Sequence, residues 1–255
     1  MAYLLGFVIG FLAGMFGVGG SSISTPALRI FLGVPPLIAL ATPLPVTIPI
    51  AITGGITYYR HGLVNLKVFS LCALAGTPGV ILGAMATRFV SGHGLMLLTS
   101  FFILLVGIRF LATAILVQRR EAIVSRALHQ SEWWEIALIG FGVGFLSGLL
   151  ANGGGFLLVP AFVFLLRFRV KEAMPTSLAV VAAFALPGTI MHWWLGHIDA
   201  RLMLQLALGV IPATYLGAHL SLRLKGRQLR ALFGVFLILF AGYFGYLQIA
   251  GLMYM

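Results

Sequence analysis

Two glycine-rich breaks in apolar sequence contain the residues best suited to bind a small anion. They read GVGGSS at residues 17–22 and ANGGGF at residues 151–156, and we expect a helix to begin within each, at about Ser21 and Gly155. The first N–H groups of a helix lack intrahelical partners and lie at the positive end of its dipole, so they attract anions. Glycine lets a ligand approach the backbone closely, and serine or asparagine side chains add hydrogen bonds. The predicted ligand-binding residues of the two breaks are Gly19, Gly20, Ser21, Ser22, Asn152, Gly153, Gly154 and Gly155.

Three further side chains are candidates for the same site. Thr42 and Thr176 stand beside helix-disrupting prolines, and their hydroxyl groups could complete the shell around an anion. Arg109, in FFILLVGIRFLATAI, is the one cation deep in an apolar segment. Its charge could attract the anion, or its long side chain could extend to the nearer polar surface. Because the backbone already supplies donors, we expect Arg109 to be secondary to the two breaks.

The two breaks belong to one unit that occurs twice in the chain. Residues 6–27, GFVIGFLAGMFGVGGSSISTPA, return at residues 140–161 as GFGVGFLSGLLANGGGFLLVPA, with an offset of 134 and no gap. Gly6, Gly10 and Gly14 recur at matching positions, and this spacing indicates close helix packing. A glycine-interrupted apolar segment that is repeated in both halves of a chain is typical of the binding site of a transporter.

The composition is that of a membrane protein. The 255 residues are 61% hydrophobic and only 8% charged, and the mean hydropathy is +1.10. A net charge of +11 would suggest nucleic-acid binding in a soluble protein, but here the basic residues lie between apolar segments. We therefore interpret them as signals of membrane topology and expect no nucleic-acid partner. The lone Cys72 excludes an intrachain disulfide.

Acidic and histidine residues limit the chemistry that the chain can perform. The acidic residues lie in the central linker or at the ends of apolar segments. No carboxylate is thus expected at the membrane centre, which argues against a metal site, a carboxylate proton relay and an acid–base enzyme. We expect no catalytic residue and no cofactor. His192, in MHWWLGH, is the best candidate for a proton carrier, the alternative being packing in the aromatic belt at the membrane interface.

Ten apolar segments must position these residues. The first two of each half are too short to cross a ~30 Å hydrocarbon core comfortably. Each short pair is then either a re-entrant hairpin, with three full spans per half and inverted repeats, or one broken spanning helix, with four spans and parallel repeats. The predicted division is a first membrane repeat at 1–118, a linker at 119–133 and a second membrane repeat at 134–255. The apolar segments cover approximately residues 3–18, 21–33, 36–59, 66–88, 94–118, 135–151, 155–167, 172–194, 200–222 and 229–251.

The distribution of basic residues favours the hairpins. In that arrangement twelve basic residues fall on the side of the linker and only three, Arg29, Arg88 and Arg201, on the other side, whereas crossing helices give nine against six. Cytoplasmic loops carry the excess of lysine and arginine. The sequence therefore predicts an all-α integral membrane protein with two inverted repeats, each a re-entrant helical hairpin plus three transmembrane helices. The linker is expected in the cytoplasm and both termini outside.

The duplicated G-x-G-G-[GS] break follows a glycine-striped helix and precedes a proline, Pro26 or Pro160, by six or seven residues. This pattern resembles the TauE/SafE sulfite exporter family over nearly the whole chain. The resemblance implies a multi-pass protein of a bacterial-type inner membrane that exports sulfite or a small organosulfonate by secondary transport. The implied partners are a small inorganic or organosulfur anion and the lipid bilayer, and a homodimer is left open. The second copy reads ANGGG where the first reads GVGGS, so the two breaks are not equivalent.

Two other functions stay open at this point. The chain could take up another small anion, such as thiosulfate, sulfate or a carboxylate, instead of exporting a sulfur oxyanion. It could also be a non-transporting membrane scaffold. A scaffold has no evident need for a duplicated glycine break within the membrane, and partner docking should place distinctive surface in long loops, whereas the loops here are short.

Overall fold

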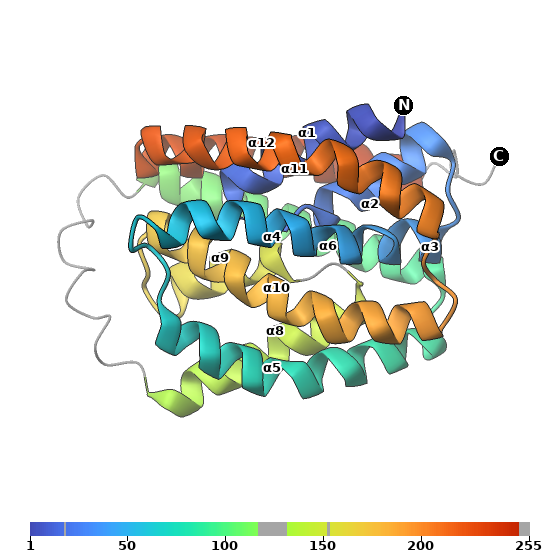
Figure 1. The fold of residues 1–255 in the computed structure, drawn as a ribbon, viewed down its shortest axis with the longest axis horizontal. Helices are drawn as coiled ribbons and strands as arrows, with labels where there is room; N and C mark the ends of the chain where they lie inside the picture. Colours follow the sequence, from blue (N-terminus) through green and yellow to red (C-terminus); the bar gives the residue numbers. More distant parts are fainter. Residues whose placement is uncertain (18, 117–131, 152–153, 250–255) are drawn as a thin grey trace.

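The computed structural model describes residues 1–17, 19–116, 132–151 and 154–249, and this part of the chain is helical without a strand (Figure 1). The predicted all-α fold is thus confirmed. Helices begin at Ser21 and Gly155, as the sequence predicts. The helices are α1 Ala2–Phe16, α2 Ser21–Leu32, α3 Pro36–Ala41, α4 Pro43–Tyr59, α5 Leu66–Ala86, the 3₁₀ turn η1 Thr87–Phe89, α6 Gly92–Leu116, α8 Trp133–Leu149, α9 Gly155–Phe164, α10 Val170–Trp194, α11 Ala200–Arg223 and α12 Gly226–Ile249.

Within the described residues, five helical segments are long and apolar enough to cross a membrane. They lie at Pro36–Tyr59, Leu66–Phe89, Gly92–Ala112, Val170–Trp194 and Ala200–Arg223. Four other helices are shorter: α1 has 15 residues, α2 has 12, α8 has 17 and α9 has 10. At 1.5 Å per residue, each falls short of a ~30 Å hydrocarbon core. Five of the six predicted spanning segments are thus found among the described residues, and α12, with 24 residues, is not one of the five.

The short helices form two pairs that open toward opposite ends of the molecule. In Figure 1, the N-terminus and the connection from α2 to α3 lie at the right, whereas the start of α8 and the connection from α9 to α10 lie at the left. Each pair turns back at its glycine break. The predicted linker lies outside the described residues except for its last two, of which Trp133 already belongs to α8.

The two halves exchange their first helices. Helix α1 packs along α11 of the second half, and α8 packs along α5 of the first half. Glycines make these contacts backbone to backbone: a Cβ added at Gly10 would lie 2.5 Å from the carbonyl oxygen of Val210, and one at Gly144 would lie 2.4 Å from that of Gly76. Any side chain at these positions would push the helices apart. The close packing predicted for the glycine stripe is confirmed.

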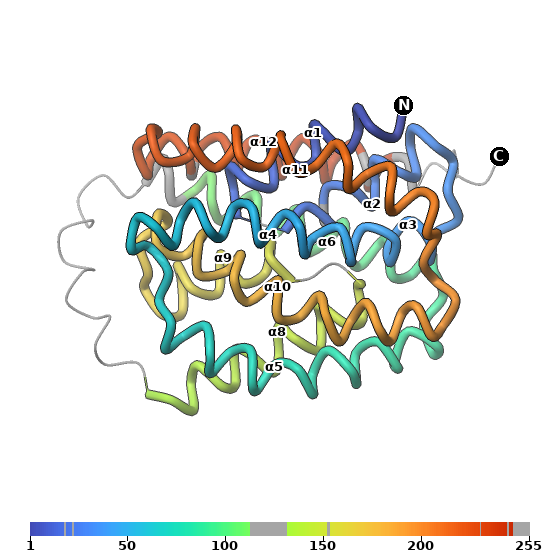
Figure 2. The backbone as a smooth tube through the Cα atoms, viewed as in Figure 1, coloured from blue at the N-terminus to red at the C-terminus, as the bar shows by residue number. Residues whose placement is uncertain are grey.

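Helices α4 and α10 cross between the two exchanged pairs (Figure 2). Helix α4 contacts α11, and α10 contacts α5 and α9. Helices α6 and α12 pack together beside them, and Phe110 of α6 meets Phe233 of α12 edge to face with ring centroids 5.0 Å apart. The hydrophobic core therefore contains helices of both halves, and α10 packs against several of them.

Candidate functional site

The first break is a turn that only glycine can form without strain. Helix α1 ends at Phe16, and Gly17, Gly19 and Gly20 all have positive φ angles, of 67°, 75° and 79°. Residues with a side chain rarely adopt such positive φ angles, because their Cβ atom clashes with the backbone. Helix α2 then begins at Ser21, which is buried. The side chain of Ser22 lies outside the described part of the structure.

The second break follows the same plan with a different sequence. Helix α8 ends at Leu149, Ala151 has a φ of 49°, and Gly154 has a φ of 73° immediately before α9 begins at Gly155. Positive φ at alanine is uncommon and carries local strain. The predicted ligand-binding residues Asn152 and Gly153 lie outside the described residues.

Both helix starts present backbone donors without a side-chain cap of their own. The N-cap residues are Gly20 for α2 and Gly154 for α9, and glycine has no side chain that could bond to the first N–H groups. Their carbonyl oxygens accept the first intrahelical bonds, for example from the N–H of Ser24 at 2.9 Å and of Leu158 at 2.8 Å. The N–H groups before these residues lie at the positive end of each helix dipole. Such an end binds an oxyanion without a charged side chain.

The same two turns of α10 border both breaks. A Cβ at Gly17 would meet Met174, and one at Gly19 would lie 2.5 Å from Cγ1 of Val181. Ser177 lies between Met174 and Val181 on α10, and its hydroxyl donates to the carbonyl of Gly155 at 3.4 Å. The structure thus brings the first break and the start of α9 to one segment of α10, residues 174–181.

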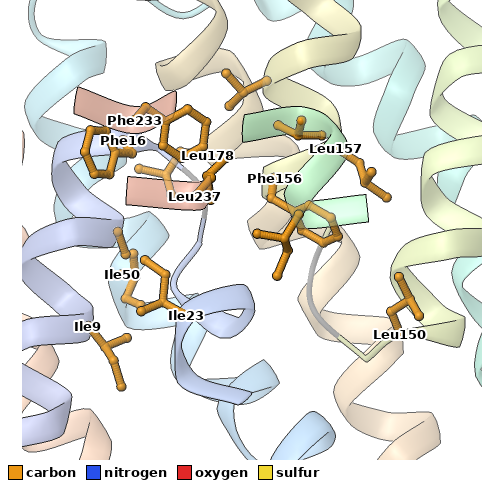
Figure 3. Close-up of a cluster of buried hydrophobic side chains, with 14 of the residues drawn as sticks. Ile9, Phe16, Ile23, Ile50, Leu150, Phe156, Leu157, Leu178, Phe233 and Leu237 are labelled. Atoms are coloured by element: carbon orange, nitrogen blue, oxygen red, sulfur yellow. The ribbon is translucent and has the colours of Figure 1, made fainter. Parts of the chain in front are cut away.

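The space between the breaks is filled with apolar side chains. Figure 3 shows Leu178 of α10 near Phe156 of α9 and Leu237 of α12, and all three side chains are almost fully buried. Electrostatic interactions are stronger in such an apolar setting than in water. A ligand bound here would therefore gain more from each backbone dipole than at an exposed helix end.

The two candidate threonines lie at equivalent positions, and each accepts a hydrogen bond from a backbone N–H of the other half. The N–H of Asn65 donates to Oγ1 of Thr176, and the N–H of Asp199 donates to Oγ1 of Thr42, both at 3.0 Å. Both threonines are fully buried. These bonds use an acceptor lone pair, so each hydroxyl keeps its single hydrogen to donate to an anion.

Arg109 is not placed with the buried breaks. Its side chain is exposed on the same side of α6 as Leu105 and Ile108. Exposed apolar neighbours mark the surface that faces lipid in a membrane helix. The position fits the alternative in which the long side chain extends toward the polar surface.

Sequence reasoning missed the role of two buried side chains at equivalent positions, Tyr58 and His192. The hydroxyl of Tyr58 donates to the carbonyl of Gly14 at 2.7 Å, and Nε2 of His192 lies 3.0 Å from the carbonyl oxygen of Gly148. Both carbonyls belong to the last turn before a break, so the two bonds fix the ends of α1 and α8. The offset of 134 pairs these residues in the sequence, but nothing there shows their partners.

The predicted alternative of interfacial packing is wrong for His192. Its side chain is only 1% exposed, because it lies beneath the end of α8. The neighbouring Trp193 and Trp194 are exposed, as expected of interface anchors. Within the described residues, no group of three histidine, cysteine, aspartate or glutamate side chains is placed to hold a metal ion.

Comparison with known proteins gives a consistent result. The model of the family described as sulfite exporter TauE/SafE matches residues 2–244. A "Probable membrane transporter protein" of Xylella fastidiosa is 30% identical over 244 residues, covering 93% of this chain and 91% of the relative. YunE of Bacillus subtilis, with the same description, is 25% identical and covers 92% and 93% of the two chains. MJ0441 of Methanocaldococcus jannaschii, also so described, is 24% identical and covers 89% and 88%. No solved structure matches the chain.

Proposed function

Because the chain belongs to the TauE/SafE sulfite exporter family, we propose that it exports a small sulfur-containing oxyanion, sulfite or an organosulfonate, by secondary transport. The curated relatives carry the name of membrane transporter proteins, which supports transport as the general activity. The described chain offers five segments able to span a membrane. We place it in the inner membrane of a bacterial-type cell, where the positive-inside rule applies.

The proposed topology is that of two inverted repeats. The helix pairs α1–α2 and α8–α9 open toward opposite ends of the molecule (Figure 1), which supports this arrangement. The end with the excess of basic residues then faces the cytoplasm, and the N-terminus lies outside. A single cysteine placed in the linker of a Cys72→Ser variant should react with a membrane-impermeant thiol reagent only in inverted vesicles. Labelling in intact cells alone would contradict this topology.

One observation carries the proposed binding site: the first break and the glycine-capped start of α9 border the same segment of α10. The anion would accept hydrogen bonds from backbone N–H groups at the starts of α2 and α9 and from the hydroxyl of Ser21. A dipole contributes up to ~2 kcal/mol when it is partly buried. Two dipoles and a few charge-assisted bonds, at about 1.5–3 kcal/mol each, are sufficient for millimolar to micromolar affinity.

Binding measurements on the purified protein test this proposal. Calorimetric titration with sulfite, thiosulfate, sulfate and a short alkylsulfonate should show the tightest binding for sulfite or the sulfonate. Tight binding of sulfate or a carboxylate alone would favour uptake of another anion instead. No binding of any of these anions would overturn the transport proposal.

Two matched pairs of variants locate the site. Ser21→Ala removes a hydroxyl at the start of α2 and should weaken binding about tenfold. Ser24→Ala is the control, because it removes a hydroxyl that lies one turn farther along α2 and donates to the carbonyl of Gly20. Gly154→Ala should abolish binding because the φ of 73° strains a side chain, whereas Gly142→Ala on exposed α8 surface should leave binding unchanged. Normal binding by a Gly154→Ala variant with an unchanged gel-filtration profile would refute the site.

A further inference from the structure

A pair of histidines connects the second break to a turn outside the spanning helices. Nδ1 of His192 lies 3.2 Å from Nδ1 of His197, and Nε2 of His192 lies 3.0 Å from the carbonyl oxygen of Gly148. His192 is buried in α10, whereas His197 is partly exposed in the connection to α11. In Figure 1 this connection lies at the same end as the N-terminus. The two rings therefore form a polar path from that end of the molecule to the last turn of α8.

The hydrogen-bond chemistry fixes a direction along this path. A carbonyl oxygen only accepts, so Nε2 of His192 must carry a hydrogen to bond with Gly148. In neutral His192, Nδ1 is then a lone-pair acceptor, and Nδ1 of His197 must donate to it. This leaves Nε2 of His197 as the nitrogen that can take up a proton from outside the pair.

The first half of the chain lacks this path. At the offset of 134, Tyr58 corresponds to His192 and Leu63 to His197. Tyr58 makes the equivalent bond to Gly14, but a tyrosine hydroxyl titrates near pH 10 and leucine does not titrate. If fixing the ends of the short helices were the only requirement, tyrosine would suffice in both halves. The histidine pair thus adds two side chains that can carry a proton beside the end of α8 only.

Few charged groups lie around His192 and His197. Arg88, in η1, acts electrostatically on His197, and the carboxylate of Asp199 beside it caps α11 by accepting from the N–H of Leu202. Arg201 follows in α11. The helices packed on α10 carry further titratable or charged groups, and the start of α10 itself adds two more. In the described residues these are Tyr58 and Tyr59 on α4, Lys67 and Cys72 on α5, Glu135 on α8, Arg227, Tyr243 and Tyr246 on α12, and Lys171 and Glu172 on α10.

We propose that His197 and His192 form a proton relay that couples anion transport to proton movement. A proton binds Nε2 of His197, and the hydrogen on Nδ1 of His197 passes to Nδ1 of His192. The hydrogen on Nε2 of His192 leaves its bond to the Gly148 carbonyl and passes to an oxyanion bound at the start of α9. One proton enters the pair and one leaves it, so both rings end neutral. The hydroxyl of Thr189, one turn before His192 on α10, is buried and without a hydrogen-bond partner in the described structure, so it can join this path. This inference rests on the proposed function, because the anion is the final proton acceptor.

Flux measurements in liposomes test the relay. The full chain is reconstituted with a pH-sensitive dye inside, and sulfite movement and internal pH are followed together. In the unaltered protein, sulfite movement should be accompanied by proton movement, and a gradient of one pH unit should change the initial rate by about fivefold or more. His192→Gln keeps an N–H donor for Gly148 but cannot pass a proton onward, so it should remove the response to the gradient. His219→Gln is the control, since that ring bonds to the carbonyl of Tyr215 within α11.

The outcomes separate the two proposals. Sulfite exchange without proton movement in the unaltered protein, or a full gradient response in His192→Gln, would overturn the relay and leave the proposed function intact. Absence of sulfite binding and exchange in the unaltered protein would overturn the proposed function and the relay with it. His197→Gln, at the partly exposed end of the pair, should give the same loss of response and serves if the buried variant does not fold.

Discussion

Replacing Gly144 by alanine should destabilise the protein through a single methyl group. Gly144 lies on α8 where that helix packs against α5, and the added Cβ would lie 2.4 Å from the carbonyl oxygen of Gly76. Real Cβ contacts are essentially never shorter than 3.0 Å, so the two backbones must separate by at least about 0.6 Å. The obstacle is backbone, which cannot rotate away as a side chain would.

The size of the effect follows from this geometry. Overpacking a close contact by one methyl group typically costs about 1–3 kcal/mol. Gly142, two residues earlier on the same helix, is exposed, and a Cβ there would have nothing within 4 Å. Alanine at Gly142 should instead stabilise the helix by about 0.5–1 kcal/mol, because glycine is a poor helix former. The same substitution should therefore have opposite signs at positions 142 and 144.

Thermal unfolding of the purified protein in detergent measures this difference. At about 2–4 °C per kcal/mol for a chain of this size, Gly144→Ala should lower the midpoint by about 2–12 °C, whereas Gly142→Ala should leave it unchanged or raise it slightly. Gly10→Ala, at the corresponding contact of α1 with Val210, should behave like Gly144→Ala. A Gly144→Ala variant as stable as Gly142→Ala would show that the helix pairs are not in backbone contact.

Three further predictions concern individual side chains. Tyr58→Phe leaves the buried Gly14 carbonyl without its bond and should lower stability by about 1–3 kcal/mol, measured by thermal unfolding. Arg109→Gln should reduce sulfite flux by less than about threefold, because the proposed site uses backbone dipoles; complete loss in a folded variant would place Arg109 in the site. Burial, and then Arg88, lower the pKa of His197 below its usual 6.5. The stability that this neutral ring contributes is therefore complete above about pH 6.5 and is lost as the pH falls toward the lower folded-state pKa, and His197→Gln should flatten that loss in unfolding midpoints between pH 7 and 5.

The segments and their lengths could be predicted because they depend on local sequence. Gly17 and Gly154 interrupt the apolar segments: α1 ends directly before Gly17, and α9 begins directly after Gly154. Periodic glycines also predicted close packing along α1. What the sequence cannot show is the partner of that packing, because any apolar helix with small residues would satisfy the same stripe. The exchange of α1 and α8 between the halves is visible only in the structure.

The candidate site was predicted less completely than the segments. The two breaks were predicted to bind an anion because a helix begins in each, and the structure has helix starts at Ser21 and Gly155. Anion binding at these helix starts stays a prediction. Thr42 and Thr176 were selected because they match in the repeat, but matching positions do not reveal that each accepts an N–H from the opposite half. His192 was recognised as titratable, yet its burial depends on the path of α8, which no local pattern encodes.

The exchanged helix pairs have a consequence for how the protein is made. Helix α1 leaves the ribosome first, but its partner α11 begins only at Ala200, about 180 residues later. At 5–20 residues per second, α1 must wait about 10–40 s in the membrane before it can dock. During that time its glycine face is covered only by lipid or by the insertion machinery. Neither half can complete its own packing alone, so any chain that stops before α11 leaves an unassembled first helix for quality control to recognise.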